Sequence, residues 1–466
     1  MQYNSLIEDS QLWQLIKAYY DQQGIRAWAN NIPFQATNHS GMVYHAARCI
    51  QAFAKPYEKV DWMELGAGHG LFSYRISQHL KAPQYHGIVS DPCEQNIAFW
   101  QHHPQWQNKN LTFKQTSFDP TLTPKRPSVF IANYMLDCLP FDAISYDQQW
   151  HQHSLTVKLP FKHLNKNIKA LHQIELEFPK HTLDIAKLPN RWQKVINTLK
   201  KPGRWSIPSL FTQWLDQLYQ HKQPVMIICS DKAFSHQAGQ RYDDVFHLHC
   251  DGCFSSVVNG EWIRQYIEMN KMGHCFWIEP CDDEINLHTF IIVLNHQPDH
   301  DFHQHIQAWI KQTSSHWMKD KHIIPFAKQM SLPECLEWLQ SHHYDPWAFD
   351  LIYPHWYALL SSHDNQSLIA LNRITEQWYV LPEQTTGLRL ADCYRQLHHW
   401  SQAHQCIDTY EHVNGRNFYA LRERGRLFYS QGLEKKAHDL WLEAHSKCHA
   451  SSTFDTWVDR VIKELT

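Results

Sequence analysis

The chain has 466 residues and a formal net charge of −3, with 43 Lys and Arg against 46 Asp and Glu. This length exceeds one ordinary hydrophobic core, so two or three domains are expected. The densest basic stretch, Lys200, Lys201 and Arg204, is short for a phosphate-binding surface, which argues against nucleic acid as the main partner. No apolar run approaches the ~20 residues of a spanning helix. Because the N-terminus also lacks the apolar core of a secretory signal, we expect a cytoplasmic protein with no membrane contact.

The 12 cysteines are expected to be reduced thiols in that compartment. One Cys-x-x-Cys pair, Cys250 and Cys253, stands just after two histidines. Zinc needs four ligands in tetrahedral reach, and the next two cysteines, Cys275 and Cys281, are not spaced as a second pair. Histidine is abundant at 35 residues, but no ligand spacing with a known mechanism occurs. No metal site is therefore predicted.

The first predicted elements are helices over residues 5–22 and 41–54, followed by a strand over 60–65. The segment 64–70, ELGAGHG, leads from this strand into a predicted helix over 71–81. Glycines let the main chain turn sharply and let a ligand approach without an intervening Cβ. The helix N-terminus adds unpaired N–H groups and a partial positive charge. The segment predicts a nucleotide-cofactor site, with an ordinary glycine-rich turn as the alternative.

Polar residues follow the next two predicted strands. The strand over 85–90 ends at Asp91, about one strand-helix unit after the glycines, where an acid can accept both ribose hydroxyls. The strand over 128–132 ends at Asn133, and Tyr134 and Asp137 come soon after. Ligands of a doubly wound sheet lie beyond the carboxyl ends of its strands, so these residues are expected to face the reaction space. Each alone could be a turn or cap residue.

Several motifs resemble known methyltransferases. The spacing E-x-G-x-G-x-G at 64–70 is similar to the first motif of class I S-adenosylmethionine-dependent methyltransferases. Residues 132–140, ANYMLDCLP, resemble the A-N-E-[FL]-[FL]-D-A-L-P segment of the MidA family, which includes the mitochondrial factor that methylates an arginine of a complex I subunit. Residues 32–40, IPFQATNHS, stand where the family has a segment that covers the cofactor, and residues 150–155, WHQHSL, resemble a family strand. The similarity spans roughly residues 12–300. Tyr134 replaces the family's Glu, and Asn38-His39 its Pro-Glu pair.

The resemblance implies S-adenosylmethionine as cofactor and a role for each matching residue. Glu64, Gly66 and Gly68 would hold the methionine end, and Asp91 the ribose. Asn133 would contact the cofactor and line the transfer site with Asp137 as the catalytic pair. If the acceptor is an arginine, Asp137 is expected to orient its guanidinium. The full cofactor-binding set implied is Glu64, Gly66, Ala67, Gly68, Asp91 and Asn133.

Further strands and helices alternate along the first 300 residues. A strand at 111–115 and a helix at 93–101 continue the α/β pattern, which predicts a doubly wound, Rossmann-like parallel sheet covered on both faces. Residues 153–159 are expected to form a further strand. Residues 165–222 are predicted to be a helical insertion that caps the open end of the sheet, because apolar residues recur there at helical spacing. Strands at 225–230, 275–278 and 289–294 and a helix at 260–271 would complete this methyltransferase domain, residues 1–300.

The last hundred residues contain a repeat. An offset of 34 residues aligns two pairs of small residues, Ala391/Gly425 and Ala403/Ala437, and two pairs of large residues, Tyr394/Phe428 and Ile407/Trp441, and it aligns Tyr410 with Ala444. A 34-residue period of paired helices is the tetratricopeptide signature, and a degenerate third unit is expected at about 352–380. An unrelated helical bundle is the alternative. The prediction is a helical connector over 301–350, starting with a capping box at Ser331–Glu334, and an all-α repeat domain over 351–466.

The combined prediction is an S-adenosylmethionine-dependent methyltransferase that acts on a protein side chain recruited by the repeats. Such repeats present a concave surface for peptides or proteins. A non-catalytic adaptor with a vestigial cofactor site is the first alternative, because Tyr134 replaces the family's Glu. A small-molecule methyltransferase whose repeats serve oligomerisation is the second. The sequence identifies neither the methyl acceptor nor the oligomeric state.

Overall fold

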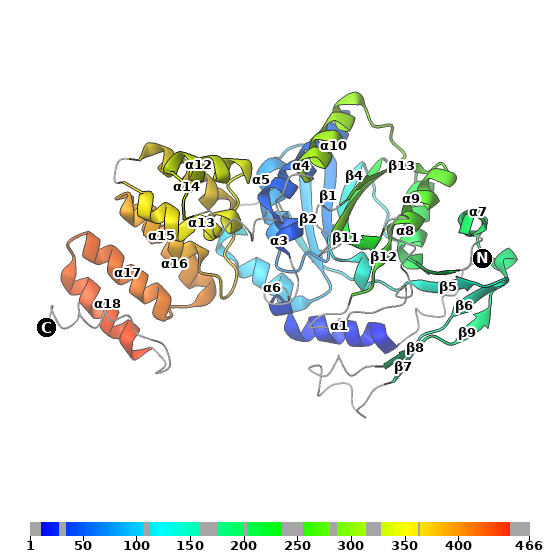
Figure 1. Cartoon of the computed structure of the whole chain (residues 1–466), viewed down its shortest axis with the longest axis horizontal. Coiled ribbons are helices and arrows are strands. Elements are labelled where there is room, and N and C mark those ends of the chain that lie inside the picture. The colour runs from blue at the N-terminus through cyan, green and yellow to red at the C-terminus, as the bar shows by residue number, and fades with distance from the viewer. Residues whose placement is uncertain are drawn as a thin grey trace. The chain divides into compact units, whose positions relative to one another are not determined.

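The computed structural model describes residues 11–27, 34–106, 111–158, 175–199, 203–234, 255–279, 287–313, 328–361 and 364–447. The chain divides into two compact units. Unit 1 comprises Met1–Asn38, Met42–Gln101 and Asn108–Met318. Unit 2 comprises His39–Gly41, His102–Gln107 and Lys319–Thr466. Unit 1 holds the sheets, and unit 2 is helical (Figure 1).

The main sheet of unit 1 has eight strands in the order β13-β14-β11-β4-β1-β2-β3, with β12 paired to β11. The run from β11 to β3 is parallel, whereas β14 is antiparallel to both β11 and β13. The strand order reverses between β1 and β4, which makes the carboxyl ends of these two strands the topological switch point. The strands are β1 Val60–Leu65, β2 Tyr85–Asp91, β3 Leu111–Gln115, β4 Ser128–Ile131, β11 Val225–Phe234, β12 Val258–Asn259, β13 Gly273–Ile278 and β14 Leu287–Leu294.

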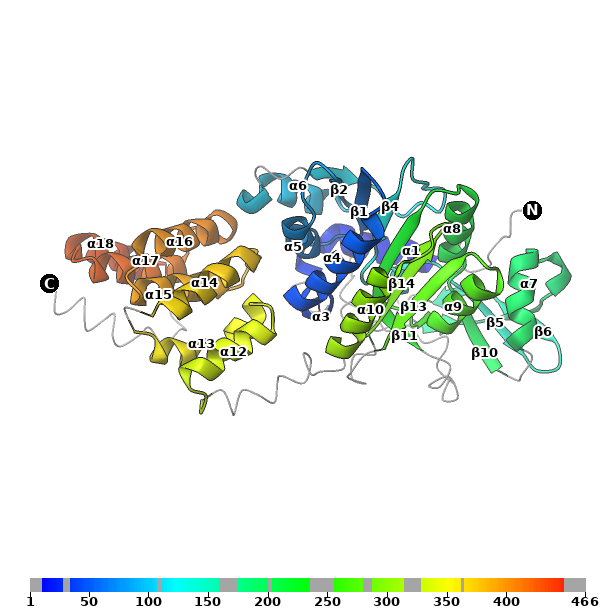
Figure 2. The ribbon, with the colours of Figure 1, turned by 90° about the horizontal axis from the view of Figure 1, so that it is seen from above.

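Helices cover both faces of this sheet. Figure 2 shows α4 and α5 on one side of the sheet and α8 and α9 on the other. One core contains alternate residues of the central strands, such as Met63, Phe130 and Ile227, packed with Trp214 of α8 and Trp262 of α9. The doubly wound α/β prediction is therefore confirmed. The helices of unit 1 are α1 Gln11–Gln23, α3 Gln35–Asn38, α4 Ser40–Ala54, α5 Leu71–His79, α6 Glu94–His102, α7 Asn190–Ile196, α8 Ser209–Gln220, α9 Gly260–Met269 and α10 His300–Thr313.

The stretch 165–222, predicted to be a helical insertion, contains strands as well as helices. Within the described part of that stretch, α7 and α8 form at the expected apolar positions, but β8, β9 and β10 also occur. A second, antiparallel sheet has the order β10-β5-β6-β9, and β7 pairs with β8. These strands are short and pair with partners far along the chain, so no local period reveals them. They are β5 Asp142–Tyr146, β6 Trp150–His153, β7 Thr156–Lys158, β8 Glu175–Glu177, β9 Lys180–Thr182 and β10 Gly203–Ile207.

Unit 2 is a series of helices with one extended core. The boundary predicted between residues 350 and 351 was wrong, because it falls inside α13. The core joins Leu339 of α12 and Phe349 of α13 to Ala391 and Ile407 of the later helices, so α12 is no separate connector. The capping box at Ser331 and Glu334 is present. The helices are α12 Leu332–Ser341, α13 Pro346–Leu359, α14 Asn365–Gln377, α15 Thr386–Gln396, α16 Trp400–Asn414, α17 Phe418–Ser430 and α18 Glu434–Ser446.

The residues of the 34-residue repeat lie where two consecutive helix pairs pack. Ala403 and Ala437 are fully buried, as is Trp441. A Cβ added to Gly425 would lie 2.2 Å from Nε1 of Trp441, so α17 requires glycine at this point. The pairs α15–α16 and α17–α18 thus repeat the same close approach. Membership of the tetratricopeptide class stays a prediction.

Candidate functional site

The glycine turn follows β1 directly. Gly66, Gly68 and Gly70 all have left-handed backbones, with φ of 65°, 56° and 82°. A side chain at these angles is disfavoured, so the conformation explains the three glycines. The turn is tied to the neighbouring strand, because Ala67 N donates to Ser90 O at 2.9 Å. The turn ends where α5 begins, at Leu71.

Asp91 fastens this turn to the end of β2. Its Oδ2 accepts from Gly68 N at 2.8 Å, and its Oδ1 accepts from Cys93 N at 2.9 Å. Burial raises the pKa of Asp91 to about 6, while the two main-chain donors act in the opposite direction. Each carboxylate oxygen has a second lone pair. Asp91 therefore shapes the turn and keeps acceptor capacity for a ligand.

Glu64 is a buried acid near the end of β1, with 4% of its surface exposed. Ser73 of α5 donates its hydroxyl to Glu64 Oε2. Burial raises the pKa of Glu64 to about 8, and the charge of Asp91 raises it further, against the lowering effect of the Ser73 hydrogen bond. Glu64 is therefore mainly protonated at neutral pH. A cation placed beside it would stabilise the ionised form.

The loop after β4 brings Asn133 to the switch point. Asn133 is 7% exposed, and among the described residues neither its Nδ2 nor its Oδ1 has a hydrogen-bond partner. A buried amide left unpaired costs about 1–3 kcal/mol for each unsatisfied group. The loop lies against the glycine turn, because a Cβ on Gly66 would be 3.9 Å from Cγ of Met135. Asn133 is thus a polar group held at the site without a protein partner.

Tyr134 has a strained backbone. Its φ of 50° is unusual for a bulky residue. Its amide donates to Ser230 O of β11 at 2.9 Å, which joins the loop to the neighbouring strand. Burial raises the pKa of its phenol well above 10, and the charges of Asp231 and Asp137 add to this. Tyr134 is therefore a neutral side chain next to two acids.

Asp137 lies in a short 3-10 turn, Leu136–Cys138. Among the described residues its buried Oδ1 has no hydrogen-bond partner. Burial raises the pKa of Asp137 to about 6. Its carbonyl accepts from both the amide and the hydroxyl of Ser256, at 2.9 and 3.0 Å. The main chain of Asp137 is held firmly while one carboxylate oxygen remains available.

Asp231 in β11 was missed as a site residue. Its Oδ2 accepts from Leu136 N at 2.8 Å and from Asp137 N at 3.2 Å. Asp231 therefore caps the 3-10 turn. If Asp137 were itself only a cap residue, it would have this structural role, but Asp231 has it instead. Burial raises the pKa of Asp231 well above its ordinary value, and the charge of Asp137 adds to this. The available signal was an acid directly after the apolar run 225–230, as Asp91 follows its own strand.

A segment before α4 lies against the glycine turn. The rings of Phe34 and His69 meet edge to face, with centroids 4.7 Å apart. His69 Nδ1 accepts from Leu71 N at 3.2 Å, and burial lowers its pKa to about 3, so it is neutral. Arg75 of α5 donates to Asn38 O. The predicted covering segment is thus adjacent to the turn from residue 34 on; residues 32 and 33 lie outside the described ranges.

The structure brings all the predicted residues to one end of the sheet. Glu64, Gly66, Ala67 and Gly68 follow or end β1, Asp91 ends β2, and Asn133 and Asp137 follow β4. The fold explains this convergence, because parallel neighbours present their carboxyl ends together. Cys250, Cys253, Cys281 and the adjacent histidines lie outside the described residues. Within the described ranges no group of three or more His, Cys, Asp or Glu is placed to hold a metal ion.

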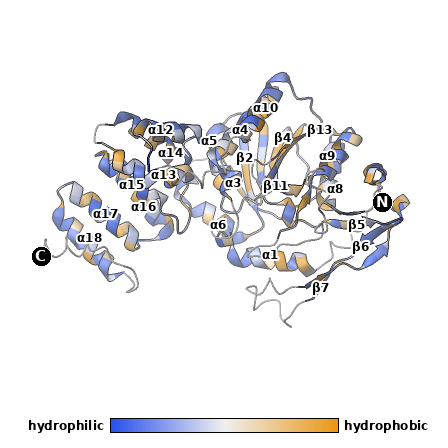
Figure 3. Cartoon of the chain, viewed as in Figure 1, coloured by the Kyte–Doolittle hydropathy of each residue, from blue (hydrophilic) through white to orange (hydrophobic). Residues whose placement is uncertain are grey.

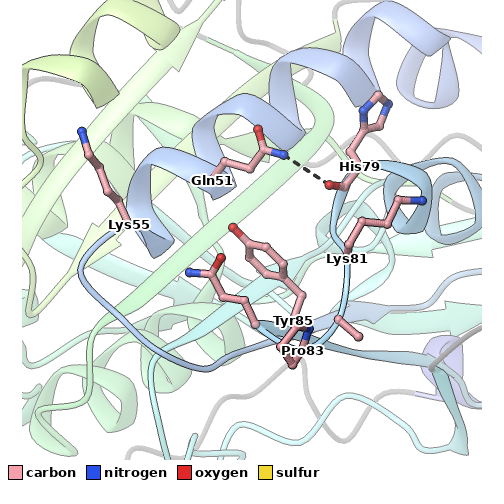
Figure 4. Close-up of a pocket in the computed structure, with 8 residues that line it drawn as sticks. Gln51, Lys55, His79, Lys81, Pro83 and Tyr85 are labelled. Atoms are coloured by element: carbon pink, nitrogen blue, oxygen red, sulfur yellow. Dashed lines mark hydrogen bonds between the residues drawn. The ribbon is translucent and has the colours of Figure 1, made fainter.

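A cavity of about 550 Å³ lies at the opposite, amino end of the strands (Figure 4). It is lined by Gln51 and Lys55 of α4, His79 of α5, and Lys81 and Tyr85 before and in β2. Gln51 Nε2 donates to His79 O at 3.2 Å across its wall. Ligands of doubly wound sheets bind at the carboxyl ends, so this cavity is not the candidate site.

The fold and site define a doubly wound α/β domain with a glycine turn at its switch point. No protein-family model and no curated protein matches the sequence. Among solved structures, a "likely methyl transferase" from Burkholderia thailandensis bound to S-adenosylhomocysteine is 11% identical, covering 56% of this chain and 79% of its own, with a TM-score of 0.40. The plantazolicin methyltransferase BpumL with S-adenosylhomocysteine is 11% identical, covering 61% and 98%, with a TM-score of 0.28. These scores are too low to support a function.

Within the described residues, no helix is both long and apolar enough to cross a membrane.

Proposed function

We propose that unit 1 is an S-adenosylmethionine-dependent methyltransferase of the MidA type. The observation that carries this proposal is the buried amide of Asn133, which has no partner among the described residues and lies beside a left-handed glycine turn at the switch point. An amide without partners in such a place is stabilised when a polar ligand supplies them. S-adenosylmethionine presents an ammonium, a carboxylate and ribose hydroxyls, which match the acids and amides of this site. When bound, the cofactor supplies an activated methyl group and its own leaving group.

The residues of the chain itself would bind the cofactor and orient it. Glu64 would pair with the ammonium, because a cation stabilises the buried carboxylate that is otherwise protonated. The left-handed turn at Gly66 and Gly68 leaves space for the methionine end where a Cβ would otherwise project. Asp91 would accept from the ribose hydroxyls with its remaining lone pairs. Holding both reactants in line is the main catalytic task.

The acceptor we propose is a protein side chain, with arginine as the specific candidate. Asp137 offers a buried carboxylate oxygen without a partner among the described residues, and a guanidinium would satisfy it. Rigid main-chain contacts to Asp231 and Ser256 would fix that oxygen in position. Tyr134 supplies bulk and no charge where the MidA pattern has Glu.

Unit 2 would recruit the protein that carries the acceptor. Alternate helices α13, α15 and α17 carry the ion pairs Arg389–Asp350, Arg395–Asp392 and Arg426–Glu423, whose arginines are more exposed than their acids. Partly exposed guanidinium groups, fixed by these acids on a repeated scaffold, suit the recognition of a polar peptide. A labelling assay, described below, would distinguish this protein methyltransferase from a non-catalytic adaptor and from an enzyme that methylates a small molecule.

Calorimetric titration with S-adenosylmethionine tests cofactor binding directly. Gly66→Ala should abolish it, and Gly432→Ala is the matched control. Both glycines are left-handed, with φ of 65° and 75°, and an added Cβ meets no close protein atom at either. The two changes should therefore cost similar folding stability, so only contact with the ligand separates them. No binding by the unaltered protein, or equal binding by both variants, would overturn the proposal.

Labelled S-adenosylmethionine incubated with the protein and a lysate of its source organism tests transfer. A labelled protein band is the expected result. Label in a small molecule would select the small-molecule enzyme. Cofactor binding without any label would select the adaptor.

A further inference from the structure

Helix α1 lies along the carboxyl edge of the main sheet. Its apolar residues Leu12, Leu15 and Ile16 are buried and pack with Phe141 and Ala143, at the start of β5. This packing fixes the first part of α1 to the chain that leaves the loop after β4. Figure 1 shows α1 below the main sheet, with one end beside α6. The helix is therefore anchored at the edge where ligands of doubly wound sheets bind.

The last turn of α1 contacts the chain on both sides of β1. The hydroxyl of Tyr20 lies 3.6 Å from Sγ of Cys138, in the 3-10 turn after β4. Gln95 of α6, the helix that follows β2, donates its Nε2 to the carbonyl oxygen of Asp21 at 3.3 Å. In the sheet, β1 lies between β4 and β2. Because Tyr20 and Asp21 are consecutive, this turn of α1 lies across the end of β1, where the glycine turn begins.

A glycine holds the end of α1 close to α6. Gly24 has a left-handed backbone with φ of 52°, and its amide donates to Tyr20 O at 2.8 Å, which closes the last turn. A Cβ on Gly24 would lie 2.8 Å from Oε1 of Gln95 and 3.5 Å from Oδ1 of Asn96. The backbone conformation and the close approach both require glycine. The C-terminal end of α1, which carries a partial negative charge, is thus held beside the start of α6.

Negative groups gather between this turn and the end of β2. Asn96 is 3% exposed, and its Oδ1 has no hydrogen-bond partner among the described residues. Its side chain is hydrogen-bonded to Asp91, so the unpaired oxygen lies next to the acid proposed to bind the ribose. Asp21 adds an exposed carboxylate on α1. Burial is the main cause of the raised pKa of Asp91, and the negative charge of Asp21 adds to it.

We propose that the last turn of α1 forms a wall of the cofactor site and that Asp21 favours the sulfonium cofactor over its neutral product. This inference rests on the proposed function. S-adenosylmethionine and S-adenosylhomocysteine differ only by the transferred methyl group and the positive charge on sulfur. A carboxylate about 8 Å from a cation in a partly solvated site changes its affinity by about three- to fivefold. The site therefore loses affinity for its ligand when methyl transfer removes the charge, which promotes release of the product.

Calorimetric titration with both ligands tests the inference. Asp21→Asn should weaken S-adenosylmethionine binding about three- to fivefold and leave S-adenosylhomocysteine binding almost unchanged. Asp21→Glu keeps the charge and should keep the ratio of the two affinities. Asp301→Asn is the matched control, because it removes one charge from a side chain that is 44% exposed and lies 3.7 Å from Lys55, at the amino end of the strands. Added salt should reduce the effect of Asp21→Asn, because this charge is exposed.

Two results would overturn the inference while leaving the proposed function intact. Equal weakening of both ligands by Asp21→Asn would show that Asp21 only supports the shape of the site. Unchanged affinity for both ligands would show that the sulfur lies away from α1. In either case the unaltered protein still binds S-adenosylmethionine. Binding of neither ligand by the unaltered protein would overturn the proposed function and, with it, this inference.

Discussion

Binding of S-adenosylmethionine should release a proton from Glu64, and the substitution Glu64→Gln should abolish that release. Glu64 is 4% exposed, and burial raises its pKa from an ordinary 4.5 to about 8. That difference corresponds to roughly 5 kcal/mol of unfavourable free energy for the buried anion. The ammonium of S-adenosylmethionine would offset much of this by Coulomb attraction, so the pKa in the complex falls. Gln keeps a carbonyl oxygen for the Ser73 hydroxyl and has no charge to titrate.

Proton linkage determines the direction in which the affinity changes with pH. With a pKa of about 8 in the free protein and a lower pKa in the complex, binding near pH 7 releases up to about 0.9 proton from Glu64. The affinity should therefore rise by up to roughly tenfold between pH 6 and 7, in excess of any change shown by Glu64→Gln. In the free protein, the same raised pKa makes stability fall as pH rises from 4.5 to 8, and Glu64→Gln should remove that loss.

Calorimetry in two buffers of different ionisation enthalpy measures the released proton, and the affinity is taken at each pH. The comparison with Glu64→Gln cancels protons from Asp91 and from the cofactor itself. Equal proton release by both proteins would refute the reasoning, because Glu64 would then not be beside the bound cation.

Two further outcomes are expected. Asp137→Asn should keep S-adenosylmethionine affinity within a few fold and lose most methyl transfer in the labelling assay, because Asp231 rather than Asp137 caps the 3-10 turn. Transfer close to that of the unaltered enzyme would remove Asp137 from the site. Gly425→Ala should destabilise unit 2 by about 1–3 kcal/mol in urea unfolding, because its Cβ would lie 2.2 Å from Trp441 Nε1. Gly432→Ala, with open space around the added Cβ and a left-handed φ of 75°, should cost about 1 kcal/mol, and an equal loss for both would contradict the packing argument.

The elements that the sequence predicted well are those with local signals. Strands β1, β2, β4 and β11 are apolar runs that lead into glycine, Asp or Asn, and their bounds agree with the expected ones within a few residues, whereas the two-residue strand β12 was not predicted. The position of the glycine turn could be predicted because its three left-handed backbone conformations favour glycine, which is visible in the sequence. These features depend on neighbours in the chain.

The missed features depend on partners far along the chain. Strands β8 to β10 are three to five residues long and are defined by pairing with β5, β6 and β7. The boundary at 350 failed because α13 spans residues 346–359 and because its buried side packs with later helices. Asp231 directly follows the predicted strand 225–230, yet its hydrogen bonds to Leu136 and Asp137 join positions about 95 residues apart.

The four acids of the site have different roles, and their hydrogen bonds distinguish these roles although their residue types do not. Asp91 and Asp231 each use both oxygens on main-chain amides, so their first task is to fix the glycine turn and the loop after β4. Glu64 accepts from the hydroxyl and the amide of a single residue, Ser73, among the described residues, and Asp137 keeps one oxygen unpaired among them. A group already held by the main chain gains less from a ligand than one that is buried and unsatisfied. We therefore assign the proposed contacts to the ammonium and to the acceptor to Glu64 and Asp137. Asp91 and Asp231, which are bound to main-chain amides, hold the glycine turn and the loop after β4 in place around those contacts.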